Sequence, residues 1–396
     1  MTSTLQPAPA AARFEMPVQW APMRSAAALE SEAKVRIIHF ERGDFEGEEF
    51  LPAPHVIEAC CRALKDGKVR YAPGAGLTEL REAIAADNTA RGRPTRPSEV
   101  LVTFGAKHAL TMSLMTLLTP GARVITPNPG YPPTEIWIKY QGAEVVHAPL
   151  VAPSFSFDLE QLDKLLPTAS LLVINSPQRP TGMLHHEIDD IAQLCAKHQV
   201  PIISDEIFSR IVYAPEGHRS ISTVESARDR TVVIDTFSKS WQMTGFRIGW
   251  CIAPENIIKT LDIYQQNSVT NVPVFVQEAA LAALTGPQDH TEEVVSRLRA
   301  KRDKAVAAIK RMPGLDCVVP EATFYVMLDV RGLGMTSEEF AKELLERHHV
   351  AVVPGTAFGS VGEGFARMTF AVPDDVLEEG LAKLEKAVTE MAERAG

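Results

Sequence analysis

Short runs of aliphatic and β-branched residues alternate with stretches of helical periodicity between about residues 56 and 285. The apolar runs predict strands at residues 101–103, 123–126, 171–174, 201–204, 231–235 and 249–252. Continuous apolar strands separated by helices are typical of a mostly parallel sheet that is covered on both faces. The pattern therefore predicts an α/β fold with a large, mostly parallel sheet.

The pattern changes near residue 290, where a long charged helix is predicted to end at Pro313 and Gly314. Strand-like segments at 323–330, 350–353 and 367–371 then alternate with helices over 337–348 and from Pro373 onward. These elements predict three parts: an irregular, proline-rich arm over residues 1–50, a large domain over 51–290 and a small α+β domain over 291–396. The arm should pack with the small domain, and a cleft between the domains is the expected ligand site.

Composition excludes several classes of protein. The 396 residues are 45% hydrophobic and 23% charged, which fits a globular chain rather than a disordered one. The net charge of -10, without a long run of Lys or Arg, argues against nucleic-acid binding. No apolar stretch approaches the roughly 18–20 residues of a membrane span, and no secretory signal is recognisable.

The five cysteines form no C-x-x-C motif, and no H-E-x-x-H motif occurs. We therefore expect reduced cysteines, a cytoplasmic location and no metal site.

Polar residues follow several predicted strands, at the edge of the sheet where α/β proteins bind ligands. Gly105, Ala106 and Lys107 open a helix, whose first N–H groups can bind an anion. Asp205 and Glu206 follow another buried strand. Because a buried, unpaired carboxylate is costly, one of these two acids should have a cationic partner.

The segment 236–240 (TFSKS) carries a third set of polar residues, and it follows the predicted strand 231–235. Lys239 is flanked by hydroxyl residues, and Arg247 stands eight positions later. Such a lysine suits a phosphorylated aldehyde, because the amine condenses with the carbonyl carbon while hydroxyl groups and a guanidinium hold the phosphate.

Together these motifs resemble the fold type I pyridoxal-phosphate enzymes, specifically the class I/II aminotransferase family, from about Val35 to the C-terminus. The segment 237–250 (FSKSWQMTGFRIGW) is the most specific part of the likeness. The resemblance implies a large domain with a seven-stranded type of sheet and pyridoxal 5'-phosphate as cofactor. It also implies amino acids and 2-oxo acids as substrates, and a homodimer.

The resemblance also implies roles for single residues. Lys239 would bind the cofactor aldehyde as a Schiff base, Asp205 would pair with the ring nitrogen, and Tyr131 would stack on the ring. Phosphate binding would fall to Gly105, Ala106, Lys107, Thr236, Ser238 and Arg247. Tyr71 would reach the phosphate in the neighbouring subunit. Arg367 would grip the substrate α-carboxylate, with Gly43 beside it.

Two departures from the family pattern fall on one spot. Arg179 stands where the family has asparagine, and Phe208 where it has tyrosine, and both family residues donate to the phenolic oxygen of the cofactor. We expect Arg179 to replace these donors with a permanent charge. Because the change alters how the cofactor is tuned, a non-transaminating enzyme of the same fold (a cyclase, a β- or γ-replacement enzyme, a lyase or an oxidase) stays an alternative.

Other functional classes find less support. A ligand-sensing regulator would need a DNA-binding module, which the first 50 residues do not provide. No G-x-G-x-x-G follows a strand as in dehydrogenases, and no G-x-S-x-G indicates a hydrolase. The substrate stays open: Lys107 slightly favours a dicarboxylate, whereas Arg42 and the acidic segment 46–49 could face a basic or bulky side chain.

Overall fold

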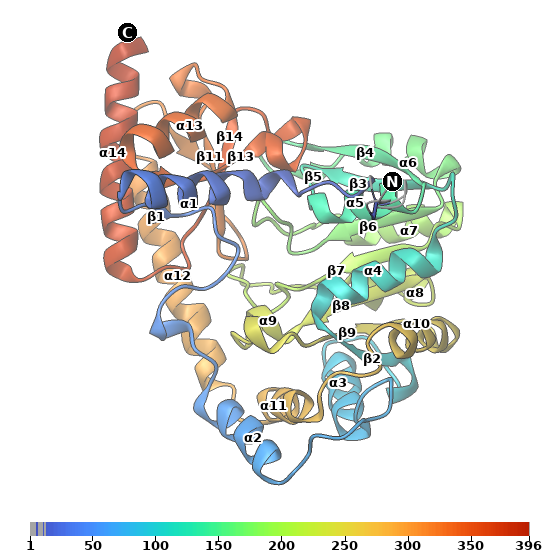
Figure 1. Ribbon diagram of the computed structural model, residues 1–396. Helices are drawn as coiled ribbons and strands as arrows, with labels where there is room; N and C mark the ends of the chain where they lie inside the picture. The colour runs from blue at the N-terminus through green and yellow to red at the C-terminus, as the bar shows by residue number, and fades with distance from the viewer. Residues whose placement is uncertain (1–4, 7–10, 12, 396) are drawn as a thin grey trace.

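The computed structural model describes residues 5, 6, 11 and 13–395, and an eight-stranded sheet lies at the centre of this part of the chain (Figure 1). Its order is β2-β9-β8-β7-β6-β3-β4-β5. The strands are β2 (Val100–Thr103), β3 (Arg123–Asn128), β4 (Glu144–Val151), β5 (Ser156–Phe157), β6 (Leu171–Asn175), β7 (Ile202–Asp205), β8 (Thr231–Thr236) and β9 (Gly249–Ile252). Strands β4, β3, β6, β7 and β8 are parallel, whereas β9 is antiparallel to both of its neighbours.

All six predicted strands of the large sheet are present, which confirms the predicted α/β fold. The seven strands from β2 to β4 correspond to the predicted sheet, and the two-residue β5 extends it. The sequence did not predict β4, because most of its residues are partly or fully exposed and it lacks a continuous apolar run.

Alternate residues of the central strands point to opposite faces of this sheet. Ile125, Leu172 and Ile202 belong to one buried cluster, and their neighbours Val124 and Leu171 belong to another. Helices α6 (Leu159–Leu165) and α7 (Ile188–His198) cover the first face, and α4 (Gly105–Leu117), α5 (Pro132–Tyr140) and α10 (Glu255–Ser268) cover the second. Each fully buried aliphatic side chain contributes roughly 1.5–3 kcal/mol, so both layers stabilise the sheet.

The remaining helices of this part of the chain lie around the β2 and β9 edge, except for the short helix over residues 225–228, whose Ala227 belongs to the cluster on the α6 and α7 face (Figure 1). They are α2 (Pro54–Lys65), α3 (Thr78–Ala90), α8 (Glu225–Arg228), α9 (Phe237–Ser240) and α11 (Val274–Thr285). Helix α9 directly follows β8 and carries Lys239, so the fold places this lysine at the carboxyl end of a central strand.

The C-terminal part contains a four-stranded antiparallel sheet, ordered β10-β11-β14-β13. Its strands are β10 (Asp316–Cys317), β11 (Tyr325–Asp329), β13 (Val353–Pro354) and β14 (Phe365–Thr369), and its helices are α12 (Asp289–Ile309), α13 (Ser337–His348) and α14 (Asp374–Ala395). Helix α13 has the predicted bounds, and a capping box between Thr336 and Glu339 fixes its start. The predicted strand over 350–353 is instead split, because β12 (Val350–Ala351) and β13 join different sheets.

The N-terminal segment is attached to this part by a parallel pair between β1 (Ile38–His39) and β12. The prediction of an irregular arm is wrong for α1 (Ala21–Ala33), a helix that begins with Pro22 in its first turn, where proline is tolerated, and continues through alanine-rich sequence. Figure 1 shows α1 in blue beside the red C-terminal elements.

Residues 1–4, 7–10 and 12 of the predicted arm lie outside the described residues. The division at residues 50 and 290 stays a prediction. Across the described chain, none of the helices combines the length and the apolar character that a bilayer span requires.

Gly249 allows β9 to lie against the start of α4. A Cβ at this position would lie 2.7 Å from the Asp235 carbonyl oxygen and 3.0 Å from the Ala106 main-chain nitrogen. Since both contacts are with backbone, a side chain here would push apart the segments that carry the predicted ligand-binding residues.

We predict that Gly249→Ala lowers the free energy of unfolding by about 1–3 kcal/mol, because the new methyl group overpacks a backbone contact. Urea unfolding measures the change. Gly245→Ala is the matched control, because a Cβ at Gly245 would have no atom within 4 Å. Equal stability of the two variants would contradict the packing argument.

Candidate active site

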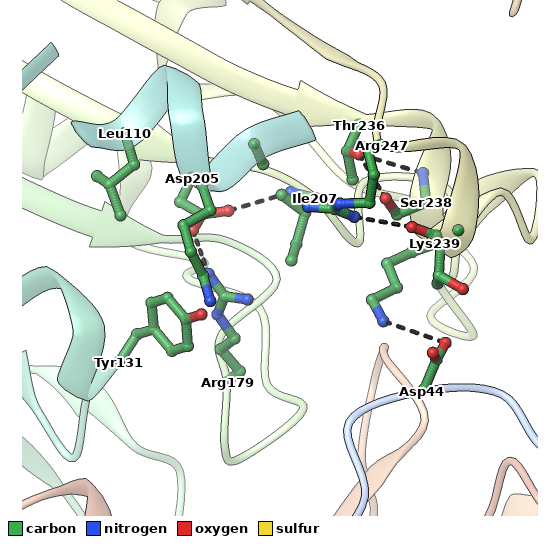
Figure 2. Close-up of a pocket in the computed structure, with 14 residues that line it drawn as sticks. Asp44, Leu110, Tyr131, Arg179, Asp205, Ile207, Thr236, Ser238, Lys239 and Arg247 are labelled. Atoms are coloured by element: carbon green, nitrogen blue, oxygen red, sulfur yellow. Dashed lines mark hydrogen bonds and ion pairs between the residues drawn. The ribbon is translucent and has the colours of Figure 1, made fainter. Parts of the chain in front are cut away.

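A cavity of about 320 Å³ lies where β7 and β8 end and α4 begins (Figure 2). It brings together predicted site residues from distant parts of the sequence. Its lining consists of Asp44, Ala106, Lys107, Leu110, Tyr131, Arg179, Asp205, Ile207, Thr236, Ser238, Lys239, Thr244, Gly245 and Arg247. Gly105 adjoins this lining as the first residue of α4.

One end of the cavity is rich in hydrogen-bond donors. Helix α4 starts at Gly105, whose φ of +74° favours glycine, and a Cβ there would lie 3.0 Å from Arg247 Nη2. The guanidinium of Arg247 is held by a 2.8 Å bond that its Nη1 donates to the Thr244 carbonyl. Ser238 donates its main-chain N–H to Thr236 Oγ1 at 3.1 Å. Helix N–H groups, hydroxyl groups and a guanidinium together suit a phosphate.

Arg179 and Asp205 form an ion pair at the other side of the cavity (Figure 2). Arg179 donates from Nη2 to Asp205 Oδ2, and its Cζ lies 3.6 Å from the centre of the Tyr131 ring. The expectation that one of the two neighbouring acids has a cationic partner is therefore confirmed for Asp205. A cofactor ring on this face of Tyr131 would need the Arg179 side chain to move.

The second departure from the family pattern has a simpler structural setting. Phe208 is buried and packs edge-on against Phe324 and Tyr325, with ring centres 5.2 and 5.8 Å away. The phenylalanine therefore extends the apolar core between the two sheets and offers no hydroxyl to the cavity. The predicted replacement of the missing donors by Arg179 stays a prediction.

Glu206 differs from Asp205 although the two are adjacent. Its carboxylate accepts hydrogen bonds from Ser204 at 2.8 Å and Ser220 at 2.6 Å. Burial raises the pKa of Glu206 to about 7, because these hydroxyl groups only partly offset the loss of water. The nearby carboxylate of Asp235 contributes to this rise in the pKa of Glu206.

Lys239 projects from α9 into the same cavity. Its Nζ donates to the Gly43 carbonyl at 2.7 Å and lies 4.0 Å from Asp44 Oδ1. Burial lowers the pKa of Lys239 from its ordinary 10.5 to about 8; Asp44 opposes this shift, and Arg179, Arg247 and Arg367 add to it. A substantial share of the amine is therefore neutral near pH 8, and the neutral amine is a nucleophile and a base.

A second cavity, of about 220 Å³, continues from the first and shares Lys107, Tyr131, Arg179 and Lys239 with it. Its other lining residues are Gln19, Trp20, Glu41, Gly43, Gly130, Tyr325, Phe358 and Arg367. Arg367 donates from Nη2 to the Glu41 carbonyl, and its Cζ lies 4.4 Å from the Tyr325 ring centre. The predicted pair Gly43 and Arg367 thus lies in the same cavity as Lys239.

Sequence reasoning missed several of these lining residues. Asp44 and Glu41 lie within two positions of Gly43 in the sequence, and this proximity to a predicted site residue could have indicated them. Tyr325 lies in an apolar strand and resembles a core residue, and Trp20 lies in the segment expected to be irregular. Tyr71 is absent from both linings and its side chain is 88% exposed.

The family model for aminotransferase class I and II matches residues 35–384. A probable aspartate/prephenate aminotransferase of Aquifex aeolicus is 36% identical over 381 residues, which cover 93% of this chain and 95% of that protein. A probable N-acetyl-LL-diaminopimelate aminotransferase of Bacillus subtilis is 35% identical over 350 residues, covering 87% of this chain and 88% of that protein.

Solved structures agree with these sequence comparisons. An alanine aminotransferase from Pyrococcus furiosus superimposes with a TM-score of 0.90 at 28% identity, over 97% of this chain and 100% of that one. The aspartate aminotransferase from Thermus thermophilus with maleate gives a TM-score of 0.89 at 30% identity, with the same coverage of both chains. The resemblance drawn from the sequence motifs is confirmed, and the chain belongs to the aminotransferase class I and II family.

Proposed function

We propose that this aminotransferase binds pyridoxal 5'-phosphate in the 320 Å³ cavity and uses Lys239 to transfer an amino group between an amino acid and a 2-oxo acid. The observation that carries the proposal is the convergence of Lys239, Asp205 and Arg247 on one cavity, because these residues supply an amine, a buried acid and a phosphate-binding cation.

The donor-rich end of the cavity would hold the cofactor phosphate. Its donors are the main-chain N–H groups of Gly105, Ala106 and Lys107, the hydroxyl groups of Thr236 and Ser238, and the guanidinium of Arg247. Gly105 supports this assignment, because a side chain at that position would crowd the Arg247 guanidinium. Helix N-termini and arginine are common phosphate ligands.

Tyr131, Asp205 and Arg179 would hold the ring of the cofactor. Arg179 Nη2 donates to Asp205 Oδ2 in this structure, and once the Arg179 side chain moves off the Tyr131 ring, the Asp205 carboxylate would accept a hydrogen bond from a protonated ring nitrogen. Once bound, the cofactor supplies an electron sink for the bond that breaks at the substrate Cα. Arg179 would lie near the phenolic oxygen, where the family has a neutral amide.

Lys239, Arg367 and Gly43 would act on the substrate. Arg367 offers a buried guanidinium to the α-carboxylate, and two parallel hydrogen bonds would fix the orientation of the Cα–H bond. Gly43 leaves space beside it, because a Cβ there would lie 3.1 Å from the Tyr325 hydroxyl oxygen. In its neutral form, Lys239 Nζ would then accept the proton from Cα and deliver it to the carbon of the cofactor that carried the aldehyde.

We also propose a homodimer in which Tyr71 reaches the site of the partner subunit. Exposed apolar side chains also occur in α2, in the segment before Tyr71 and in and just after α10; they are Leu64, Val69, Ile263 and Val269. Gln265 of α10 donates to the Gly74 carbonyl at 2.7 Å, so the loop and this helix form one surface. Exposed apolar patches of this kind mark protein interfaces.

We also propose that the domains divide at residues 50 and 290 and that the protein is cytoplasmic. The second cavity supports the division into domains, because Tyr131 and Lys239 line it from one part of the chain and Tyr325 and Arg367 from the other. The five cysteines are free thiols, as expected in a reducing compartment.

Lys239→Ala should abolish both the visible absorbance of the bound cofactor and the formation of 2-oxo acid from amino acids, because the Lys239 amine would both bind the aldehyde and move the substrate proton. Absorbance spectra and a screen of the twenty amino acids measure these effects. Lys107→Ala is the matched control, since Lys107 lines the same cavity, and it should keep the absorbance. If Lys107→Ala loses the absorbance and Lys239→Ala keeps it, Lys107 rather than Lys239 binds the cofactor.

The rate at which the cofactor-free protein captures pyridoxal 5'-phosphate should rise with pH and level off above about 8, where Lys239 becomes neutral. The sign follows from chemistry: the neutral amine attacks the aldehyde, and burial makes it available below the ordinary lysine pKa of 10.5. Stopped-flow absorbance over pH 6 to 10 measures the rate. A rate that keeps climbing to pH 10 would show that Lys239 is an ordinary lysine.

A further inference from the structure

Glu41 is a buried acid in the wall of the second cavity. Its side chain is 1% exposed, and its Oε1 lies 2.8 Å from His39 Nδ1. The main-chain oxygen of the same residue accepts the hydrogen bond from Arg367 Nη2. Because a buried carboxylate without a partner would be strongly destabilising, His39 is what keeps Glu41 in place.

His39 joins Glu41 to helix α1. Its Nε2 lies 3.2 Å from Oε1 of Glu30, which belongs to α1. An imidazole flanked by two carboxylates can satisfy both only as the imidazolium, which donates from each nitrogen. The chain Glu30–His39–Glu41, called here the relay, therefore links α1 to the carbonyl that holds Arg367.

Glu41 also supplies a negative charge that the second cavity otherwise lacks. Lys107, Arg179, Lys239 and Arg367 all line this cavity, and Glu41 is the acid among its lining residues. Burial lowers the pKa of Arg367; Tyr325 and the Glu41 carboxylate oppose this shift, whereas Arg179 adds to it. Arg179 replaces a neutral residue of the family, so the pocket carries an additional cation that Glu41 partly offsets.

We propose that Glu41 is a positioning residue for Arg367: its carbonyl and its carboxylate, locked through His39 to helix α1, hold the guanidinium in the orientation that binds the substrate carboxylate. This inference rests on the proposed function of Arg367. It gives a role to Glu30, His39 and Glu41, which the family motifs do not include. Substrate binding would then depend on the contact between His39 and Glu30 of α1.

The relay should make substrate binding depend on pH. The pKa of His39 is raised above 6.5, and the hydrogen bond with Glu41 is the largest cause. Glu30 also raises this pKa, whereas burial and the charge of Arg42 lower it. The imidazolium is therefore present below this raised pKa, and the relay weakens as the pH rises through it. The Michaelis constant for the amino donor should increase over the same range.

The test compares variants of the holoenzyme, with the best amino donor from a screen of the twenty amino acids. Glu41→Gln should raise KM about tenfold and change kcat less than about twofold, because it weakens binding in the ground state and transition state alike. His39→Gln should remove the pH dependence that the wild type shows above pH 6.5. Glu30→Gln should raise KM by a smaller factor, because Glu30 is the outer and more exposed link.

Arg36→Gln is the matched control, since Arg36 lies in the same segment but pairs on the surface with Glu379. It should leave KM and its pH profile unchanged. If Glu41→Gln fails to fold, His39→Gln and Glu30→Gln carry the test. A purely structural role would lower stability without separating KM from kcat.

Arg367→Gln separates failure of this inference from failure of the proposed function. If Arg367→Gln leaves KM at the wild-type value, Arg367 does not bind the substrate, and the proposed roles of both Arg367 and Glu41 are overturned. If Arg367→Gln raises KM while the relay variants keep the wild-type KM and pH profile, only the role of Glu41 is overturned.

Discussion

The buried carboxylate of Asp205 is the constraint on which the site depends. It lies at the end of β7 with 3% of its surface exposed, where an ionised acid needs a cation or several donors. Arg179 meets that need, and it lies against Tyr131 while doing so. A protonated pyridine stacked on Tyr131 and paired with Asp205 would take the place that the Arg179 guanidinium occupies in this structure.

The rest of the site is shaped by the crowding of positive charge. Arg179, Arg247 and Arg367 each lower the pKa of Lys239, in addition to the effect of burial. The same charges attract phosphate and carboxylate groups, so a field that favours anionic ligands also keeps the lysine reactive. Asp44 and Glu41 balance this field at its edge, on the segment that also supplies the carbonyls for Lys239 and Arg367.

Much of this could be predicted from the sequence, because the relevant signals are local. Lys239 and Arg247 lie within one strand–helix–strand segment, and Asp205 ends an apolar strand whose position the pattern fixes. The contacts of Arg179 could not be predicted, because Tyr131 and Arg179 come from two separate loops and Asp205 from a strand end, and their side-chain positions depend on packing. Helix α1 was not predicted, because Pro22 and the polar residues near its start do not give a clear helical pattern. Glu41 was not predicted either, because its pairing with His39 depends on the burial of both side chains, which the sequence does not reveal.

Reduction of the holoenzyme with borohydride, followed by peptide mapping, identifies the lysine that binds the cofactor. Borohydride fixes the bond between a lysine and the cofactor aldehyde, so the label reports which amine forms it. We expect a single labelled peptide that contains Lys239 within the segment 237–250. A label on another lysine, or no label on a protein that carries the cofactor, would contradict the account.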